Sequence, residues 1–201
     1  MYENQNAFRS EGWRLQSRNY ILYKFFNSLF LGLSVGTIFV IYAPLDPSVY
    51  SLGGILLALA MLGIAQLYPR IMTLPWFFRI SLLVELTVLG MVLWFLISPY
   101  TWLTALLVYA GYQLTFSFGS YLVRAETMAL EDDELLRKVD SAKQLGYLAG
   151  MAGSWLLYKL LEWQAITDKQ AKVYDLHWGL LGVELLILFF LLRSFKKSAE
   201  R

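Results

Sequence analysis

Two acidic residues lie in the middle of long apolar runs, where a charge is costly. Glu85 stands in the run 76–97 and Glu184 in the run 176–193. An ionised carboxylate at the centre of a bilayer costs about 2.5–3.5 kcal/mol, so such a residue faces inward, is paired or is protonated. We therefore predict that Glu85 and Glu184 bind a proton or a cationic solute. The alternative is a protonated structural glutamate that is hydrogen-bonded to a neighbouring helix.

A second group of candidates combines aromatic rings with a few amide and hydroxyl groups. Tyr109, Gln113 and Phe116 follow i, i+4, i+7 spacing and share one helix face. Such a lining suits a small organic solute, and the alternative is hydrogen bonding between helices. The predicted substrate-binding residues are Tyr23, Asn27, Tyr109, Tyr112, Gln113, Phe116 and Arg124.

The composition excludes several classes of function. The chain has no cysteine and a single histidine, His177, which removes disulfides and thiolate chemistry and leaves no basis for a metal site. A net charge of +2 is too small to favour nucleic-acid binding, and the sequence has no Gly-Lys-Ser/Thr nucleotide loop. We expect no enzyme activity, no metal and no cofactor.

Six long apolar runs account for most of the 201 residues, of which 58% are hydrophobic and 16% charged. A helix needs roughly 20 apolar residues to cross a bilayer. The sequence therefore predicts an all-α, polytopic membrane protein with six transmembrane helices. The expected spans are 21–43, 49–68, 76–97, 102–123, 142–163 and 176–193.

Basic residues predict the orientation of these spans, because Lys and Arg collect on the cytoplasmic side. Fourteen of the 17 lie on one side, which places both termini in the cytoplasm. Residues 1–19 then form a cytoplasmic or interfacial segment, either a surface helix or a disordered tail. Residues 20–195 form the transmembrane domain, and residues 196–201 form a cytoplasmic tail.

The two glutamates also point to an internal repeat. Val84-Glu85-Leu86 lies in the third span and Val183-Glu184-Leu185 in the sixth, at matched depth. These two spans are predicted to cross the membrane in opposite directions. Corresponding helices of an inverted repeat have that relation, so we predict a 3+3 inverted repeat.

The cytoplasmic end of the fourth and fifth spans carries a family resemblance. Arg124 closes a helix, the charged segment 126–140 follows, and a glycine-rich helix begins at 143–154. This part resembles one half of a major facilitator superfamily transporter. The resemblance implies that spans one and four line a cavity while spans three and six support it. Because the family has twelve spans, it also implies that two copies form a homodimer.

Three other features have simpler interpretations. The patterns Gly32-x-x-x-Gly36 and Gly146-x-x-x-Gly150 let helix backbones approach closely. Lys24 is expected to extend toward the membrane surface. The segment 126–140 is expected to be a solvated cytoplasmic helix, with an acidic residue there as the partner of Arg124.

The leading prediction is transport of a small solute, with coupling to protons through Glu85 or Glu184. The alternatives are a solute-binding subunit of a larger transporter and a membrane scaffold that binds no solute. The short loops and the absence of Asn-x-Ser/Thr sites agree with the bacterial inner membrane. The expected partners are the lipid bilayer, a small-molecule solute and a second copy of the chain.

Overall fold

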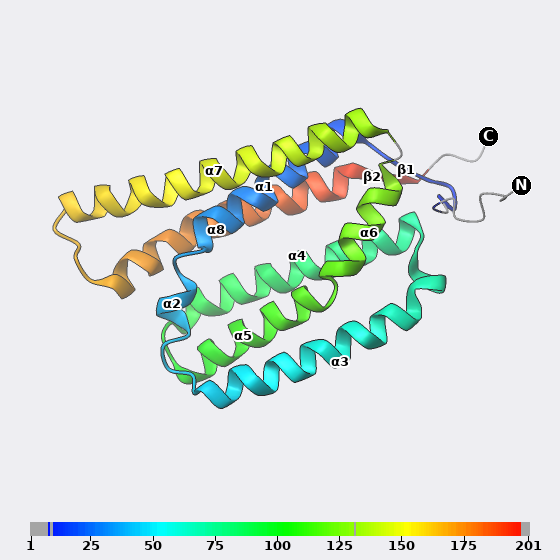
Figure 1. Ribbon diagram of the computed structural model, residues 1–201. Coiled ribbons are helices and arrows are strands. Elements are labelled where there is room, and N and C mark those ends of the chain that lie inside the picture. Colours follow the sequence, from blue (N-terminus) through cyan, green and yellow to red (C-terminus); the bar gives the residue numbers. More distant parts are fainter. Residues whose placement is uncertain (1–7, 9, 131, 198–201) are drawn as a thin grey trace, which may run out of the picture.

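The computed structural model describes residue 8 and residues 10–130 and 132–197, and these residues are mostly helical (Figure 1). The elements are, in chain order, β1 (Trp13–Leu15), α1 (Ser17–Ser34), α2 (Ile38–Ile41), α3 (Pro47–Ile71), α4 (Leu74–Ile97), α5 (Trp102–Ser117), α6 (Gly119–Ala129), α7 (Asp133–Trp163), α8 (Lys169–Ser194) and β2 (Phe195–Lys197).

The long helices form two groups of three that lie side by side (Figure 1). In one group α1 packs against both α7 and α8, and in the other α5 packs against both α3 and α4. The groups meet where α4 packs against α8. This junction places the two helices that carry Glu85 and Glu184 in direct contact.

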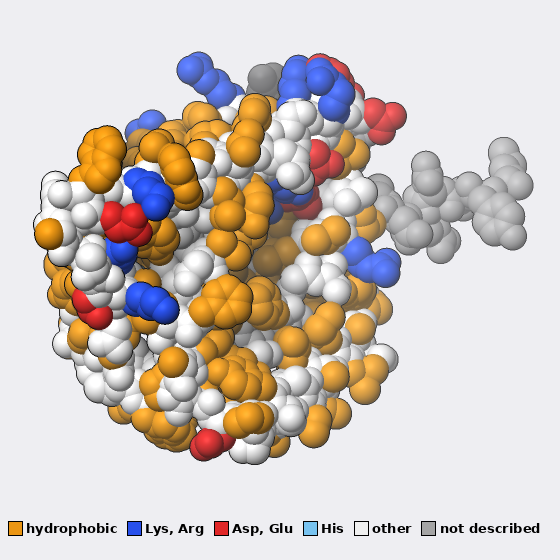
Figure 2. Space-filling view, turned by 60° about the vertical axis from the view of Figure 1, so that its left-hand side comes forward, with side chains coloured by type: hydrophobic (Ala, Val, Ile, Leu, Met, Phe, Trp, Pro, Cys, Tyr) orange, Lys and Arg blue, Asp and Glu red, His pale blue; other side chains and the backbone are white. Residues whose placement is uncertain are grey.

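Three helices are long and apolar enough to cross a membrane, namely α3, α4 and α8. The prediction of a mostly helical protein is confirmed, and the length and composition of these three helices are compatible with a membrane protein. Hydrophobic side chains also cover much of the surface, whereas charged ones are confined to a few places (Figure 2). This surface suits a lipid environment.

Two of the expected spans are interrupted. The run 21–43 is divided between α1 and α2, and the run 102–123 is divided between α5 and α6. At each break a serine hydroxyl bonds to its own helix backbone: Ser34 to Leu31 O at 3.2 Å and Ser117 to Leu114 O at 2.6 Å. Such bonds compete with the helix ladder, and a glycine follows two residues later in each case.

Glycines bring α1 and α7 into close contact, as the sequence predicted for Gly146 and Gly150. A Cβ added to Gly150 would lie 2.9 Å from the backbone nitrogen of Leu33 and 3.0 Å from the Cα of Gly32. A Cβ added to Gly32 would lie 2.9 Å from Met151 N. Gly36 is different, because its nearest neighbour is the Tyr158 hydroxyl at 3.9 Å.

The start of α1 and the end of α8 are held together by a short antiparallel pair of strands, in which Trp13 faces Lys197 and Leu15 faces Phe195. Residues 13–15, considered above as part of a surface helix, are therefore extended. The segments 1–7 and 198–201 lie outside the described residues.

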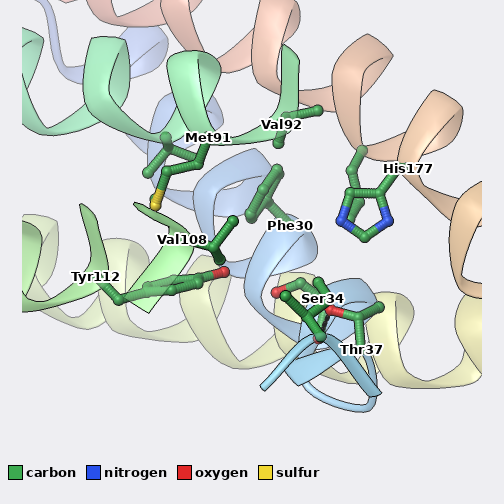
Figure 3. Close-up of a pocket in the computed structure, with 11 residues that line it drawn as sticks. Phe30, Ser34, Thr37, Met91, Val92, Val108, Tyr112 and His177 are labelled. Carbon is green, nitrogen blue, oxygen red and sulfur yellow. Dashed lines mark hydrogen bonds between the residues drawn. The ribbon is translucent and has the colours of Figure 1, made fainter. Parts of the chain in front are cut away.

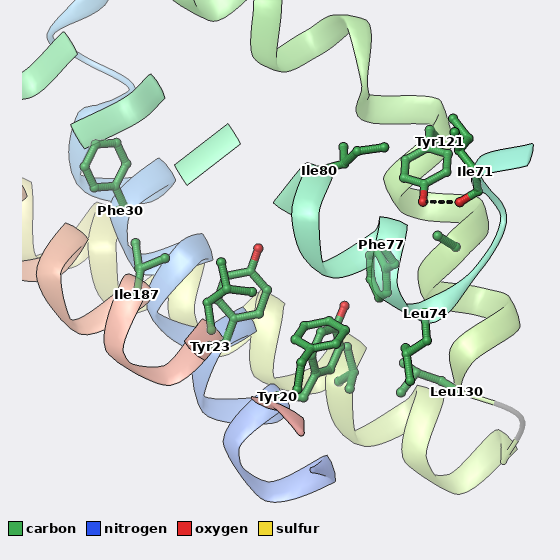
Figure 4. Packing of buried hydrophobic residues seen from close by; sticks show 14 of the residues in the cluster. Tyr20, Tyr23, Phe30, Ile71, Leu74, Phe77, Ile80, Tyr121, Leu130 and Ile187 are labelled. Carbon is green, nitrogen blue, oxygen red and sulfur yellow. Dashed lines mark hydrogen bonds between the residues drawn. The ribbon is translucent and has the colours of Figure 1, made fainter. Parts of the chain in front are cut away.

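Beside these strands, aromatic residues of α1, α4 and α6 fill the core (Figure 4). There the Tyr121 hydroxyl donates a hydrogen bond to Ile71 O at 2.8 Å.

Candidate functional site

Glu85 and Glu184 are both buried at the junction of α4 and α8. Their exposed fractions are 1% and 0%. Glu85 lies eleven residues after the first residue of α4, and Glu184 lies ten residues before the last residue of α8. Since α4 and α8 are packed together, the two carboxyl groups lie at a similar height. The Glu85 carboxyl group acts electrostatically on the Glu184 carboxyl group.

Glu85 is held by hydrogen bonds from α1. The Tyr23 hydroxyl donates to Glu85 Oε1 at 2.6 Å, and the Asn27 amide donates to the same oxygen at 3.0 Å. The sequence assigned Tyr23 and Asn27 to solute binding and Glu85 to proton or cation binding. The structure brings all three together, and both donors serve the carboxyl group.

Glu184 has the opposite environment. Neither of its carboxyl oxygens has a hydrogen-bond partner among the described residues, although the side chain is completely buried. The charged group that acts electrostatically on it is the Glu85 carboxyl group. A buried polar group without a partner costs about 1–3 kcal/mol, and a second negative charge nearby adds repulsion. Binding a proton relieves both penalties.

A third buried carboxylate, Glu126 on α6, forms the centre of what we call the Glu126 cluster: Tyr20, Lys24, Glu126 and Lys143. The Lys24 ammonium lies 2.6 Å from Glu126 Oε2, and the Tyr20 hydroxyl donates to that oxygen at 2.7 Å. Lys143 pairs with the other oxygen and also with Asp140 at 3.1 Å. The cluster joins α1, α6 and α7 at one end of the molecule.

The charges in this cluster keep Glu126 ionised. Burial opposes ionisation, but the Lys24 and Lys143 ammonium groups outweigh it and lower the pKa of Glu126 to about 2. The sequence interpretation missed this residue, because it placed Glu126 in a solvated segment. Lys24 likewise pairs inside the protein instead of extending toward the membrane surface. Its side chain is only 14% exposed.

A small cavity lies between α1, α4, α5 and α8 (Figure 3). Its volume is about 20 Å³, which is enough for a single water molecule. The Tyr112 hydroxyl points toward Ser34 across this space (Figure 3). His177 lines the opposite wall, where its ring stacks on Phe95 with centroids 3.9 Å apart and its Nδ1 lies 2.6 Å from Val173 O. His177 is thus buried.

The other predicted solute-binding residues do not join this site. Tyr109 and Gln113 line a groove between α3 and α5 with a volume of about 270 Å³. The Tyr109 hydroxyl donates to Tyr50 O at 3.2 Å, and Gln113 Oε1 is buried without a partner among the described residues. Phe116 is 54% exposed. Arg124 is exposed, and its guanidinium carbon lies 5.9 Å from the Tyr68 ring centre, which is an aromatic contact.

The described residues contain no group of three or more His, Asp or Glu side chains that could hold a metal ion. Comparisons with known proteins found no matching family model, no matching curated protein and no matching solved structure. The geometry of the site is therefore the basis for a functional proposal.

Proposed function

We propose that this chain is a polytopic inner-membrane protein that binds protons at the Glu85–Glu184 pair and couples them to the movement of a small solute. The observation that carries the proposal is Glu184, a completely buried carboxyl group with both oxygens unpartnered, beside a second buried carboxyl group. Buried ionisable residues inside a membrane domain are expensive and usually mark ion or proton pathways. Proton exchange requires no more space than the water-sized cavity nearby.

The helix contacts support the further proposal of six spans in a 3+3 inverted repeat. If α1, α3 and α4 correspond to α5, α7 and α8, the contact of α1 with α7 matches that of α5 with α3. The contact of α1 with α8 then matches that of α5 with α4. The α4–α8 contact is unchanged, because α4 and α8 correspond to each other. A pseudo-two-fold axis through the α4–α8 junction produces this pattern, and it puts the two glutamates next to the axis.

The solute path is proposed to form between two copies of the chain, as the resemblance to half of a major facilitator transporter implies. The volume between α1 and α5 is too small for an organic solute, so a single copy offers no such path there. With six crossings both termini lie on one side, which allows two parallel copies to pair with two-fold symmetry. Mass measurement in nanodiscs is expected to give about twice the 23.2 kDa chain mass. A strict monomer would contradict this arrangement.

Infrared difference spectroscopy of the purified protein tests proton binding directly. As the pH is raised, the carbonyl band of a protonated, non-hydrogen-bonded carboxyl group is expected to disappear. Glu184→Gln should remove this signal, whereas Glu134→Gln, which changes an exposed carboxylate paired with Arg137 at 2.8 Å, should retain it. A wild-type spectrum without any such titrating band would overturn the proposal.

The same variants test the coupling to a solute. Proteoliposomes that contain a pH-sensitive dye are exposed to a panel of small organic solutes, and solute-induced proton movement is recorded. The wild-type protein and Glu134→Gln are expected to respond to the same solute, and Glu184→Gln is not.

The size of the cavity between α1 and α5 also favours a second candidate function, a membrane scaffold that carries no solute. A scaffold predicts no response to any solute in the panel, in either the wild-type protein or the variants.

A further inference from the structure

Lys24 lies between Glu126 and the Glu85–Glu184 pair. On α1, Tyr20, Tyr23, Lys24 and Asn27 follow i, i+3, i+4, i+7 spacing and so share one face. Tyr20 contacts Glu126, and Tyr23 and Asn27 contact Glu85. The Lys24 ammonium lies 5.5 Å from the Tyr20 ring centre and 5.2 Å from the Tyr23 ring centre. Figure 4 shows both rings on the same side of α1.

The charges around Lys24 leave room for one further negative charge. Two ammonium groups, those of Lys24 and Lys143, face the single buried carboxylate of Glu126. Asp140 also pairs with Lys143, but its side chain is 68% exposed, so solvent screens it. The buried part of the network therefore carries one excess positive charge when Glu85 and Glu184 are both protonated.

We infer that Lys24 is the counter-ion that exchanges between two carboxylates: it pairs with Glu126 when the Glu85–Glu184 pair holds two protons, and it shifts toward Glu85 when the pair loses one. This inference rests on the proposed proton binding at that pair. Lys24 is a positioning residue in this scheme, because it sets the charge of the site without itself transferring the proton.

Two features make the exchange physically reasonable. Lys143 remains bound to Glu126 after Lys24 leaves, so Glu126 stays neutralised throughout. The aromatic faces of Tyr20 and Tyr23 flank the ammonium group along its route, and such faces stabilise cations that are removed from water. Loss of one proton from the pair then creates no uncompensated buried charge.

The other titratable groups around the pair come from each helix packed against it. Tyr20 and Tyr23 on α1 and Tyr112 on α5 act electrostatically with the pair, and Glu126 on α6, Lys143 on α7 and His177 on α8 lie further along the same helix packing. Among the described residues, Lys24 is the cation that acts electrostatically on the Glu85 carboxyl group.

The test follows the pH midpoint of the protonated-carboxyl infrared band in the full-length protein. Lys24→Gln removes the counter-ion and is expected to raise the midpoint by about 1 pH unit or more. Glu126→Gln removes the competing carboxylate, so Lys24 is free to pair with Glu85 and the midpoint is expected to fall. Lys143→Gln leaves Lys24 paired with Glu126 without the second cation, so Lys24 is held there and the midpoint is expected to rise. Lys159→Gln, which removes an exposed cation paired with Glu162 at 2.9 Å, is the matched control and is expected to leave the midpoint unchanged.

A merely structural role for Lys24 predicts midpoints that do not move in opposite directions. Unchanged midpoints in Lys24→Gln and Glu126→Gln, or shifts of the same sign, would overturn the inference while leaving proton binding at the pair intact. A missing band in the wild-type protein would instead remove the proposed function. If Lys24→Gln is poorly folded, Lys24→Arg retains the charge and is expected to keep the midpoint near that of the wild-type protein.

Discussion

Replacement of Gly150 with leucine is expected to prevent α1 and α7 from packing and so to abolish the folded protein. Any side chain at this position meets backbone atoms of α1, at 2.9 Å for Leu33 N and 3.0 Å for Gly32 Cα. Backbone cannot move aside as a flexible side chain does, so the whole helix must shift. Overpacking of this kind costs about 3 kcal/mol or more, a large part of a total stability of about 5–15 kcal/mol.

Size-exclusion chromatography and thermal unfolding in detergent measure this effect. Gly182→Leu on α8 is the matched control, because a Cβ at Gly182 meets nothing within 4 Å. The control is expected to elute as a single peak with an unchanged Tm, whereas the Gly150 variant elutes in the void volume or is lost. Two variants with equal yield and equal Tm would show that the close approach of α1 and α7 does not stabilise the protein.

Leucine at the two glutamates is expected to change stability in opposite directions. Glu85→Leu leaves the Tyr23 hydroxyl and the Asn27 amide without their acceptor. The unpaired hydroxyl of buried Tyr23 costs about 1–3 kcal/mol and the half-buried Asn27 amide adds to it, which corresponds to a fall in Tm of about 5 °C or more. Glu184→Leu removes a buried carboxyl group that has no partner among the described residues, so the Tm is expected to rise by a few degrees.

Thermal unfolding of both variants at the same pH in the same detergent tests this contrast. A fall in Tm for Glu184→Leu as large as that for Glu85→Leu would mean that Glu184 has stabilising partners in the membrane. A rise for Glu184→Leu alone would identify a residue that is retained at a cost in stability, which is characteristic of functional sites.

The sequence determined the features that follow from composition and local spacing. Apolar runs of about 20 residues predict helices long enough to cross a membrane, and the runs around Glu85 and Glu184 became α4 and α8 with both carboxyl groups buried. The glycines of α7 could be interpreted without coordinates, because small residues four apart on an apolar helix already imply a close neighbour.

Tertiary structure decided which polar groups meet. Tyr23 and Glu85 are 62 positions apart, and Tyr20 and Glu126 are 106 apart. Spacing along one helix indicates a shared face but carries no information about the helix opposite. Tyr109 and Gln113 were therefore correctly placed on one face, yet that face meets α3 and not the glutamates.

Glu126 shows the same limit most clearly. Its charged neighbours in the sequence are typical of a solvated segment, and nothing in that pattern marks one of the carboxylates as buried. It is buried only because the chain bends between α5 and α6 at Phe118 and places it between Lys24 on α1 and Lys143 on α7. A buried charge depends on partners from distant segments, so only the packing of the helices could reveal it.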